Sequence, residues 1–572
     1  MSISLHVPNS VYDMIHADKY RGPQEGFREA CNRQASALAD SAKHYDDYRH
    51  ILLGDYFLPG GRIQSAIGST RITTAFNCFV SGKIYDSFVE GVKGHPIEGY
   101  GSIMHRATQA AATMRLGGGI GYGFSHLRPY GDLIKKLQSY TSGPLAFMRI
   151  YDAVCECVSS AGHRRGAQMG VLRIDHPDIE RFIHSKQNST EFKNFNISVG
   201  VTDEFMRCLK NKLPFPLTFE GKVYRTVDPV MLWDMLMRST WDWADPGVLF
   251  IDRINDWNNL YYCEIIEATN PCGEQPLPAY GACLLGSFNL VRFLRHTGSR
   301  FEFDYGLLKG TIPHVVRAMD NVVDRTIYPL PEQEMEAKSK RRMGLGITGL
   351  ANTLEALGFP YGSDGFLDCQ RNIQRLIRND VYQSSIDLAK EKGSFEKLDK
   401  GKYLEAKFIK TLPDNIRDGI EQHGIRNSHL LSIAPTGTIS LAAGNVSSGI
   451  EPPYDYEYSR KILMEDGSKN TYDLSDFGYR ELGVNGKTVK TIGVEEHVNV
   501  LVTAQEFVDS AVSKTCNVPT DYDWHSFKQV YEKAYDRGAK GCTTYRKGGK
   551  RDSIFDESQS CTIDEAGRKS CE

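Results

Sequence analysis

A five-residue loop at 270–274, with the sequence Asn-Pro-Cys-Gly-Glu, constrains the fold more than any other stretch of the chain. Pro271 and Gly273 break both helices and central strands, so the apolar run before them ends in a tight loop. The loop presents an amide, a thiol and a carboxylate, and Cys283 follows after a second segment rich in proline and glycine. A thiol beside a carboxylate that could act as a general base indicates a reactive site. The alternative is a buried structural cysteine next to a surface glutamate.

The composition is that of an ordinary globular protein, with 41% hydrophobic and 24% charged residues among 572. A net charge of −3 gives no electrostatic basis for binding DNA or an anionic membrane surface. No stretch reaches the roughly 18 consecutive apolar residues of a membrane helix, and the N-terminus lacks the pattern of a secretion signal. We therefore expect a cytoplasmic protein with no membrane contact and no direct DNA binding.

The 13 cysteines are an odd number in a chain without a secretion signal, so structural disulfides are not expected. Cys155 and Cys157 lie on a helical pattern without a second Cys or His pair at zinc-site spacing, so no metal site is predicted. Cys561 and Cys571 lie in a polar tail that has no core pattern. Two thiols there would suit the transfer of reducing equivalents into a buried site, and chance placement is the alternative.

Five glycines fall within residues 117–123. A dinucleotide-binding loop needs a strand before the glycines, a helix directly after them and an acidic residue further on, and this context is missing. We therefore expect a glycine-rich strand that lies against a substrate or another backbone segment.

The rest of the chain alternates strands and helices. A short buried strand is expected around Cys78, residues 170–183 and 195–206 each predict a strand, a turn and a helix, and 214–225 predicts a hairpin. Helices are expected at 10–55, 89–115, 228–244, 305–328, 365–393, 493–517 and 524–537. A last strand is expected at 538–547.

A second informative stretch runs from 429 to 454. An apolar strand ends in Pro435, Thr436, Gly437, Thr438 and Ile439, where small residues and free backbone N–H groups open a helix. Such a segment is typical of a phosphate cradle, because the N–H groups and the helix dipole both point at the anion. The alternative is an ordinary capped helix.

Taken in order, these landmarks resemble those of one family, the large catalytic subunit of ribonucleotide reductase, from about Phe57 to Arg551. They are FNCFV at 76–80, LGGGIGYGFSHLRP at 116–129, SGPLAFMRIYDA at 142–153, RRGAQMGVLRIDHPDI at 164–179, FNISVGVTD at 195–203, NPCGE at 270–274, CLLGSFNL at 283–290, RRMGLGITGL at 341–350 and APTGTISLAAGNVSSGIEP at 434–452. The motifs NPCGE and PTGTIS together are highly specific for this family, and the motif sequences are closest to those of the adenosylcobalamin-dependent class II enzymes.

The resemblance implies an α/β fold, a ten-stranded α/β barrel made of two antiparallel five-stranded halves with a finger loop at its centre. It implies a short helical N-terminal region at 1–56, the catalytic barrel at 57–551 and a flexible redox tail at 552–572. The family's ATP-binding cone has no room before Phe57, so no dATP off-switch of that kind is expected.

The resemblance also implies the catalytic roles. Cys272 would become a thiyl radical and take the 3′ hydrogen of a ribonucleotide, Glu274 would deprotonate the 3′-OH, and Asn270 would hold the hydroxyls. Cys78 and Cys283 would supply two electrons and end as a disulfide. Cys561 and Cys571 would reduce that disulfide and be recharged by a thioredoxin-like partner.

Substrate and effector residues follow by the same mapping. The substrate residues would be Asn77, Gly119, Ser142, Gly143, Pro435, Thr436, Gly437, Thr438 and Ile439. The binding site for a dNTP or ATP specificity effector, at the interface of a homodimer, would comprise Asp86, Ser87, Phe88, Arg128 and Lys135. Residues 158–169 match the loop that relays effector identity to the substrate.

The radical source is where the sequence departs from the enzymes that import a radical from a ferritin-like small subunit. Those enzymes carry two stacked tyrosines where this chain has Thr543 and Thr544. Adenosylcobalamin is therefore the predicted cofactor, and a metal-containing small subunit is the alternative. Two further departures are the run Gly60-Gly61-Arg62-Ile63, which replaces a hydroxyl-bearing run, and the wide spacing of the two tail cysteines.

Overall fold

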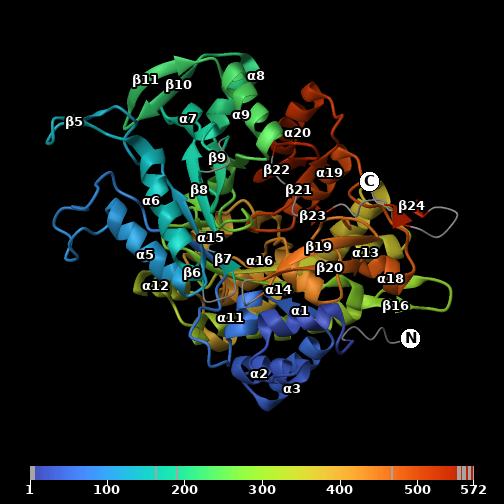
Figure 1. Cartoon of the computed structure of the whole chain (residues 1–572). Coiled ribbons are helices and arrows are strands. Elements are labelled where there is room, and N and C mark those ends of the chain that lie inside the picture. The colour runs from blue at the N-terminus through green and yellow to red at the C-terminus, as the bar shows by residue number, and fades with distance from the viewer. Residues whose placement is uncertain are drawn as a thin grey trace.

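The computed structural model describes residues 7–160, 164–165, 167–187, 191–464, 468–550, 555–556, 562–563 and 569–570. Three helices open the chain, α1 (Val11–Tyr20), α2 (Phe27–Leu38) and α3 (Ala42–Leu53). Serine hydroxyls cap the N-termini of α1 and α3, which satisfies backbone N–H groups that have no partner within the helix. The three helices form a layer at one end of the molecule, at the bottom of Figure 1.

Five strands of the largest sheet run parallel, in the order β2 (Cys78–Val80), β3 (Gly119–Gly123), β8 (Gln168–Arg173), β9 (Phe195–Val201) and β12 (Gly247–Phe250). Parallel neighbours need a crossover connection, and helices supply it here. These helices are α5 (Ile103–Arg115), α6 (Gly143–Cys157), α7 (Ile179–Ile183), α8 (Asp203–Asn211) and α9 (Pro229–Trp243).

A second set of parallel pairings joins β15 (Ala282–Asn289) to β18 (Met343–Thr348), and β21 (Thr515–Val518) to β22 (Gly541–Arg546). Single parallel bridges, Leu345 to Leu431 and Ile433 to Val512, place the extended segment 430–434 between β18 and the residues leading to β21. The two sets meet in antiparallel pairs, β15 with β2 and β12 with β22. β1 (Phe57–Pro59) adds an antiparallel pairing to β15. The chain is thus a mixed α/β protein with one large mixed sheet.

Helices pack around the second set of strands (Figure 1). They are α11 (Tyr305–Arg325), α12 (Pro331–Lys340), α13 (Leu350–Ala356), α14 (Asp364–Lys392), α16 (Asp414–His423), α17 (Gly437–Ala442), α19 (Val494–Gln505) and α20 (Trp524–Asp536). In the described part of the chain, no helix is long and apolar enough to cross a bilayer.

A short antiparallel hairpin, β13 (Ile266–Thr269) and β14 (Pro276–Pro278), carries the loop at 270–274. It lies against the glycines of β3. A methyl group on Gly121 would stand 1.8 Å from the Thr269 carbonyl oxygen, and one on Gly119 would stand 3.1 Å from Pro271 Cγ. The expectation that the glycine-rich strand lies against another backbone segment is confirmed, because only glycine permits this approach.

Two predicted helices are shorter than expected. The helix expected at 89–115 begins at Ile103, because Gly91, Gly94, Gly99 and Gly101 all have positive φ and hold the chain in turns. The helix expected at 493–517 ends at Gln505, and β21 occupies the end of that range. The hairpin expected at 214–225 is confirmed as β10 (Phe215–Phe219) and β11 (Lys222–Val227).

Candidate active site

Asn270, the first residue of the loop at 270–274, joins the two ends of the loop by hydrogen bonds to Gln275. Asn270 N–H donates to the Gln275 carbonyl at 3.0 Å, and its Oδ1 accepts from Gln275 N–H at 2.9 Å. Gly273 N–H donates to the Asn270 carbonyl at 3.1 Å, with φ +83 at Gly273. Asparagine at the start and glycine near the end are therefore what the turn requires. These hydrogen bonds define the turn of the loop.

Three neighbouring segments hold this loop in place. Asn196 on β9 donates from Nδ2 to the Pro271 carbonyl at 2.8 Å. The Ala511 N–H donates to the Glu274 carbonyl at 3.0 Å. Gln275 Nε2 donates to Ser432 Oγ at 2.8 Å. Because these anchors come from both sets of parallel strands, the loop position depends on the closure of the whole sheet.

The loop brings an amide and a carboxylate to the Cys78 thiol. Asn270 Nδ2 donates to Cys78 Sγ at 3.1 Å, and Cys78 Sγ lies 4.0 Å from Glu274 Oε1. Cys78 on β2 is the direct cross-strand partner of Cys283 on β15. These four residues are buried, whereas Cys272 at the loop tip is exposed.

Electrostatics keep Cys78 protonated. Burial raises the pKa of the Cys78 thiol well above its ordinary value, and the neighbouring Glu274, Cys283 and Cys272 add to the rise. Burial likewise raises the pKa of Cys283, and the Arg342 guanidinium acts in the opposite sense. Cys78 is thus a protonated thiol at neutral pH.

The segment Pro435–Ile439 turns into the short helix α17. Thr436 adopts φ +53, and its hydroxyl accepts from Gly449 N–H at 2.7 Å. The same hydroxyl lies 3.0 Å from Thr348 Oγ1 at the end of β18 and accepts from Ser440 Oγ at 2.8 Å. This hydroxyl network fixes the turn, so the backbone N–H groups of Gly437 and Thr438 start the helix in a defined direction.

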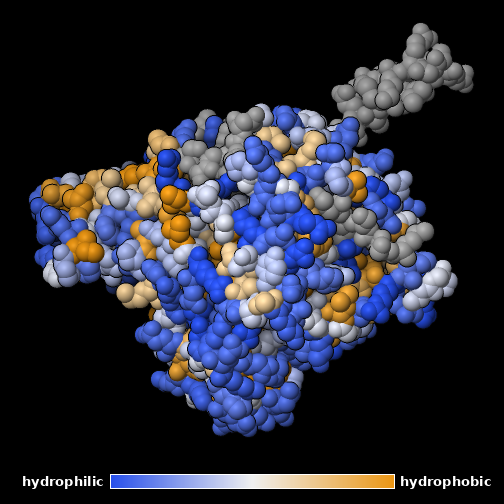
Figure 2. Space-filling model, turned by 90° about the horizontal axis from the view of Figure 1, so that it is seen from below, coloured by the Kyte–Doolittle hydropathy of each residue, from blue (hydrophilic) through white to orange (hydrophobic). Residues whose placement is uncertain are grey.

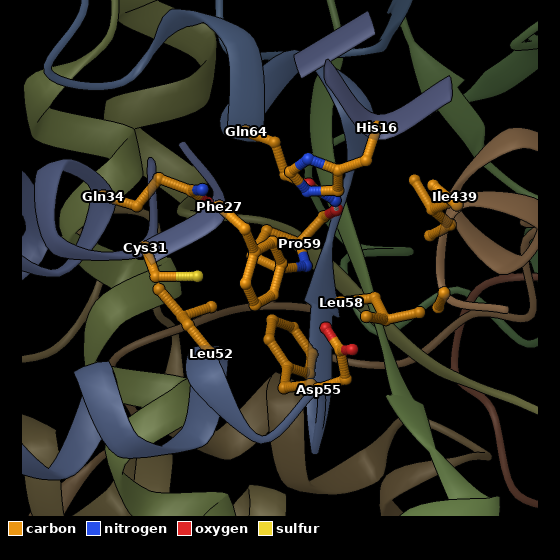
Figure 3. A pocket seen from close by; sticks show the side chains of 13 residues that line it. His16, Phe27, Cys31, Gln34, Leu52, Asp55, Leu58, Pro59, Gln64 and Ile439 are labelled. Atoms are coloured by element: carbon orange, nitrogen blue, oxygen red, sulfur yellow. Dashed lines mark hydrogen bonds between the residues drawn. The ribbon is translucent and has the colours of Figure 1, made fainter. Parts of the chain in front are cut away.

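A cavity of about 20 Å³ lies behind α17, between it and the N-terminal helices (Figure 3). Its lining includes Ile439 of the predicted cradle together with His16, Gln34 and Asp55. Burial raises the pKa of Asp55 to about 7, opposed by Arg292. The N-terminal helices therefore support the cradle from behind.

The other predicted substrate residues divide into two groups. Gly119 N–H donates to the Asn77 carbonyl at 3.1 Å, and Gly119 packs against Pro271, so both lie beside the loop. Asn77 Oδ1 is buried with no hydrogen-bond partner among the described residues. The Ser142–Gly143 turn instead lies against Tyr130 and Asp178.

The predicted effector residues lie in one region. Asp86 accepts from the Arg128 N–H at 3.2 Å and from its Nε at 2.9 Å. Ser87 Oγ accepts from Gly91 N–H, and Phe88 is 52% exposed. Lys135 follows β4 (Leu133–Ile134) and is exposed.

Cys561, Cys571 and, in the loop at 158–169, residues 161–163 and 166 lie outside the described residues. No cluster of three or more His, Cys, Asp or Glu side chains suited to a metal occurs in the part of the chain that the structure describes.

Sequence reasoning missed the residues that hold the site from outside. Ser432 is the single polar residue of the apolar segment 430–434, and Asn196 is one of two polar residues in β9, so a polar residue in an apolar strand is the signal that could have found them. Thr348 ends a glycine-rich strand, and nothing local connects it with Thr436.

Comparisons with known proteins identify the family. A family model described as the barrel domain of ribonucleotide reductase matches residues 94–545. The vitamin B12-dependent ribonucleoside-diphosphate reductase of Mycobacterium tuberculosis (strain CDC 1551 / Oshkosh) is 33% identical over 95% of this chain and 79% of that protein. The protein of the same name from Thermoplasma acidophilum is 34% identical over 89% of this chain and 66% of that protein. The chain therefore belongs to the ribonucleotide reductase family, as a large subunit with the family's barrel domain.

Proposed function

We propose that this chain reduces ribonucleotides to 2′-deoxyribonucleotides by a thiyl-radical mechanism, with adenosylcobalamin as the radical source. The observation that carries the proposal is the contact of Asn270 and Glu274 with Cys78, whose cross-strand partner is Cys283. Two adjacent thiols, a carboxylate and an amide around one loop match the needs of a reaction that removes a hydroxyl group and takes up two electrons.

The residues divide the reaction among them. The Cys272 thiyl radical takes the hydrogen atom from C3′, and Glu274 accepts the proton of the 3′-OH. The 2′-OH leaves as water with a proton from Cys78. Cys78 and Cys283 together supply two electrons and two protons and become a disulfide. Cys272 then returns the hydrogen atom to C3′, so the radical is regenerated and one water is released per turnover.

The strand pairings support a barrel. The pairings run from β2 through β12 to β22, then through β21, segment 430–434 and β18 to β15, which pairs with β2 again. We interpret this ring as ten strands in two parallel halves of five, set antiparallel to one another, with the loop at 270–274 as the central finger. The interior then holds Cys78 and Cys283 with Val80, Leu285 and Ala268 in one apolar cluster.

Substrate binding is proposed for the residues beside the loop. Pro435, Thr436, Gly437, Thr438 and Ile439 would hold the phosphates through backbone N–H groups at the fixed turn. The unpartnered Asn77 amide oxygen and Gly119 would contact the sugar side. Ser142 and Gly143 are proposed to join this set, as the family resemblance implies, at a turn where Gly143 lies against Tyr130 and Asp178.

The cofactor assignment rests on the relatives and on the loop tip. The relatives named above are vitamin B12-dependent. Adenosylcobalamin, when bound, supplies an organic radical beside its target. Cys272 fits such a source, because its side chain is exposed whereas that of Glu274 is buried. Thr544 is buried and bonded to Tyr531 at 2.8 Å, where a subunit-fed enzyme would need stacked tyrosines. The alternative radical source is a ferritin-like partner subunit.

Regulation and assembly are proposed from one surface. Asp86, Ser87, Phe88, Arg128 and Lys135 would bind a dNTP or ATP effector. Exposed apolar residues, Val89, Ile97, Leu133, Leu137 and Tyr140, occur in the same region. Figure 2 shows apolar surface on the projection at the left, the side on which Figure 1 places α5, α6 and β5. Apolar patches of this kind mark interaction sites, and we assign this one to a homodimer interface.

The reductant is proposed to be the pair Cys561 and Cys571, recharged by a thioredoxin-like protein. Both residues lie outside the described part of the chain, so this assignment comes from the sequence.

One assay tests the proposed function. Purified protein is incubated with dithiothreitol, a ribonucleoside di- or triphosphate and a dNTP effector, with and without adenosylcobalamin, and the deoxynucleotide is quantified. We expect product only when the cofactor is present. Absence of product with the cofactor, together with activity restored by a co-purified metalloprotein, would refute the cobalamin assignment and leave the reaction itself standing.

A further inference from the structure

Arg342 lies in line with the two buried thiols. Cys78 on β2 is opposite Cys283 on β15, and on the other side of β15 the parallel pairing to β18 begins with Leu284 opposite Met343. Extended by one residue beyond the start of β18, this register puts Arg342 opposite Cys283, and the Arg342 charge acts on the Cys283 thiol. Directly opposed residues in a sheet project to the same face. The register therefore sets the thiols and the guanidinium in one row across three strands.

A buried ion network fixes this guanidinium. Arg342 is 2% exposed and pairs with Glu264 and Glu336, the second at 2.6 Å. Lys340 completes the network at 2.9 Å from each carboxylate. Two cations and two anions balance, so the network can stay charged in a low-dielectric interior. Arg342 is therefore held at a defined place and cannot turn to solvent.

The two thiols have different electrostatic neighbours. Glu274 lies 4.0 Å from Cys78 and disfavours a negative charge there. At Cys283 the strongest influence after burial is Arg342, which favours the negative charge, while Asp509, Glu274 and Glu336 act against it. The pair is thus asymmetric, because a guanidinium acts on Cys283, whereas Cys78 faces the Glu274 carboxylate and accepts a hydrogen bond from the neutral Asn270 amide.

We propose that Arg342 is a positioning residue for the redox pair: it makes Cys283 the leaving thiolate, so that a reducing dithiol attacks Cys78. The proposal rests on the proposed function, which makes Cys78 and Cys283 a disulfide after each turnover. The proposal adds which of the two sulfurs the reductant attacks, and it names the residue that determines this choice.

The step balances in thiols and electrons. A thiolate of the dithiol attacks Cys78 Sγ, the Cys78–Cys283 bond breaks, and Cys283 leaves as a thiolate beside Arg342. The second thiol of the reductant then attacks the reductant's first sulfur, which is bonded to Cys78 in the mixed disulfide. This expels Cys78, which takes up a proton. The reductant ends as a disulfide. Cys283 takes up the other proton that the two reductant thiols release, so both cysteines end as thiols, the form needed for the next loss of water.

Reagents have a route to this pair. A cavity of about 650 Å³ is lined by Val80, two residues beyond Cys78, and by Glu264, the partner of Arg342. Val80 and Leu277, which also lines the cavity, belong to the same apolar cluster as both thiols. The cavity therefore borders the apolar cluster that holds both thiols.

The test uses the full chain with Cys561→Ser and Cys571→Ser, so that reduction by the tail does not interfere. The protein is oxidised with diamide, desalted and treated with cysteamine as a single thiol. Samples are quenched in acid over a time course, and peptide mass spectrometry locates the adduct. Neither cofactor nor nucleotide is present. Arg342→Gln and Arg342→Lys are compared with Arg341→Gln, because the neighbouring Arg341 is also a buried arginine but pairs with Asp320 and Asp324.

We expect the adduct on Cys78 in the parent protein and in Arg341→Gln. Arg342→Gln should lose this bias and slow the first step on the order of tenfold at neutral pH, because a poorer leaving thiolate is expelled more slowly. Arg342→Lys should keep the bias. An adduct on Cys283 in the parent protein, which needs no variant to fold, or an unchanged bias in Arg342→Gln overturns the proposal. If no Cys78–Cys283 disulfide forms, the redox pair of the proposed function fails as well.

Discussion

Gly121→Ala is the substitution that the packing of the finger hairpin makes most informative. The new methyl carbon would stand 1.8 Å from the Thr269 carbonyl oxygen, and side-chain carbons do not approach other atoms within 3.0 Å. The hairpin must therefore move by about 1.2 Å, and a displacement on the order of 1 Å at a reacting group costs roughly a hundredfold in rate. Because the contact is with backbone, no rotamer change relieves it.

The expected result is a fall in kcat of roughly a hundredfold or more, with a loss of stability of about 1–3 kcal/mol from overpacking. Turnover is measured as deoxynucleotide formed per chain, and stability as the midpoint of urea unfolding. Gly123→Ala is the matched control on the same strand, since its methyl carbon would stand 3.4 Å from Glu267 Cβ, an ordinary contact. Gly121→Ala with turnover within a few-fold of Gly123→Ala would refute the claim that the glycines position the loop.

Further predictions concern single side chains. Glu274→Gln should lower kcat by about 10²–10⁴, the usual range for a general base, with effector affinity unchanged by calorimetry. Asn270→Ala should reduce the free energy of unfolding by about 1–3 kcal/mol, because it leaves the Gln275 N–H without its acceptor, and denaturant titration measures this. Asp55 has a pKa of about 7 against an ordinary 3.8, so its contribution to stability is complete at low pH and is lost as the pH rises through 7. Asp55→Asn should remove that loss, roughly 4 kcal/mol in full and about 3 kcal/mol of it between pH 5 and pH 8, and unfolding curves at those two pH values show whether the difference exists. Arg128→Gln should weaken dNTP binding, measured by calorimetry, while leaving turnover without effector intact, and unchanged affinity would exclude Arg128 from the effector site.

Local chemistry made much of the site predictable. Pro271 and Gly273 predict a turn in any context, and the glycines of 117–123 predict that another chain segment or a ligand approaches their backbone closely. The hairpin against β3 joins these two signals in one contact. The pairing of the cysteines on β2 and β15 could be predicted only from the family resemblance, because the sequence of neither strand indicates which strand lies next to it.

Other features depend on contacts that sequence patterns do not encode. Segment 430–434 has one bridge and a few backbone hydrogen bonds to the chain on each side, so its place follows from its neighbours. The turn at Thr436 is fixed by hydroxyl contacts with Thr348, 88 residues away. The row formed by Arg342 and the two thiols follows from register, which a slip of one residue would destroy. The substrate role of the Ser142–Gly143 turn stays a prediction, because it comes from the family motif alone and Gly143 lies against Tyr130 and Asp178.

The central claim is that a thiol at position 272 begins ribonucleotide reduction in this chain. The direct measurement compares the protein with Cys272→Ser, each incubated with adenosylcobalamin, dithiothreitol, a ribonucleotide and a dNTP effector. The account predicts deoxynucleotide from the parent protein and none from Cys272→Ser, with equal effector affinity in both. Deoxynucleotide formed by Cys272→Ser would contradict it.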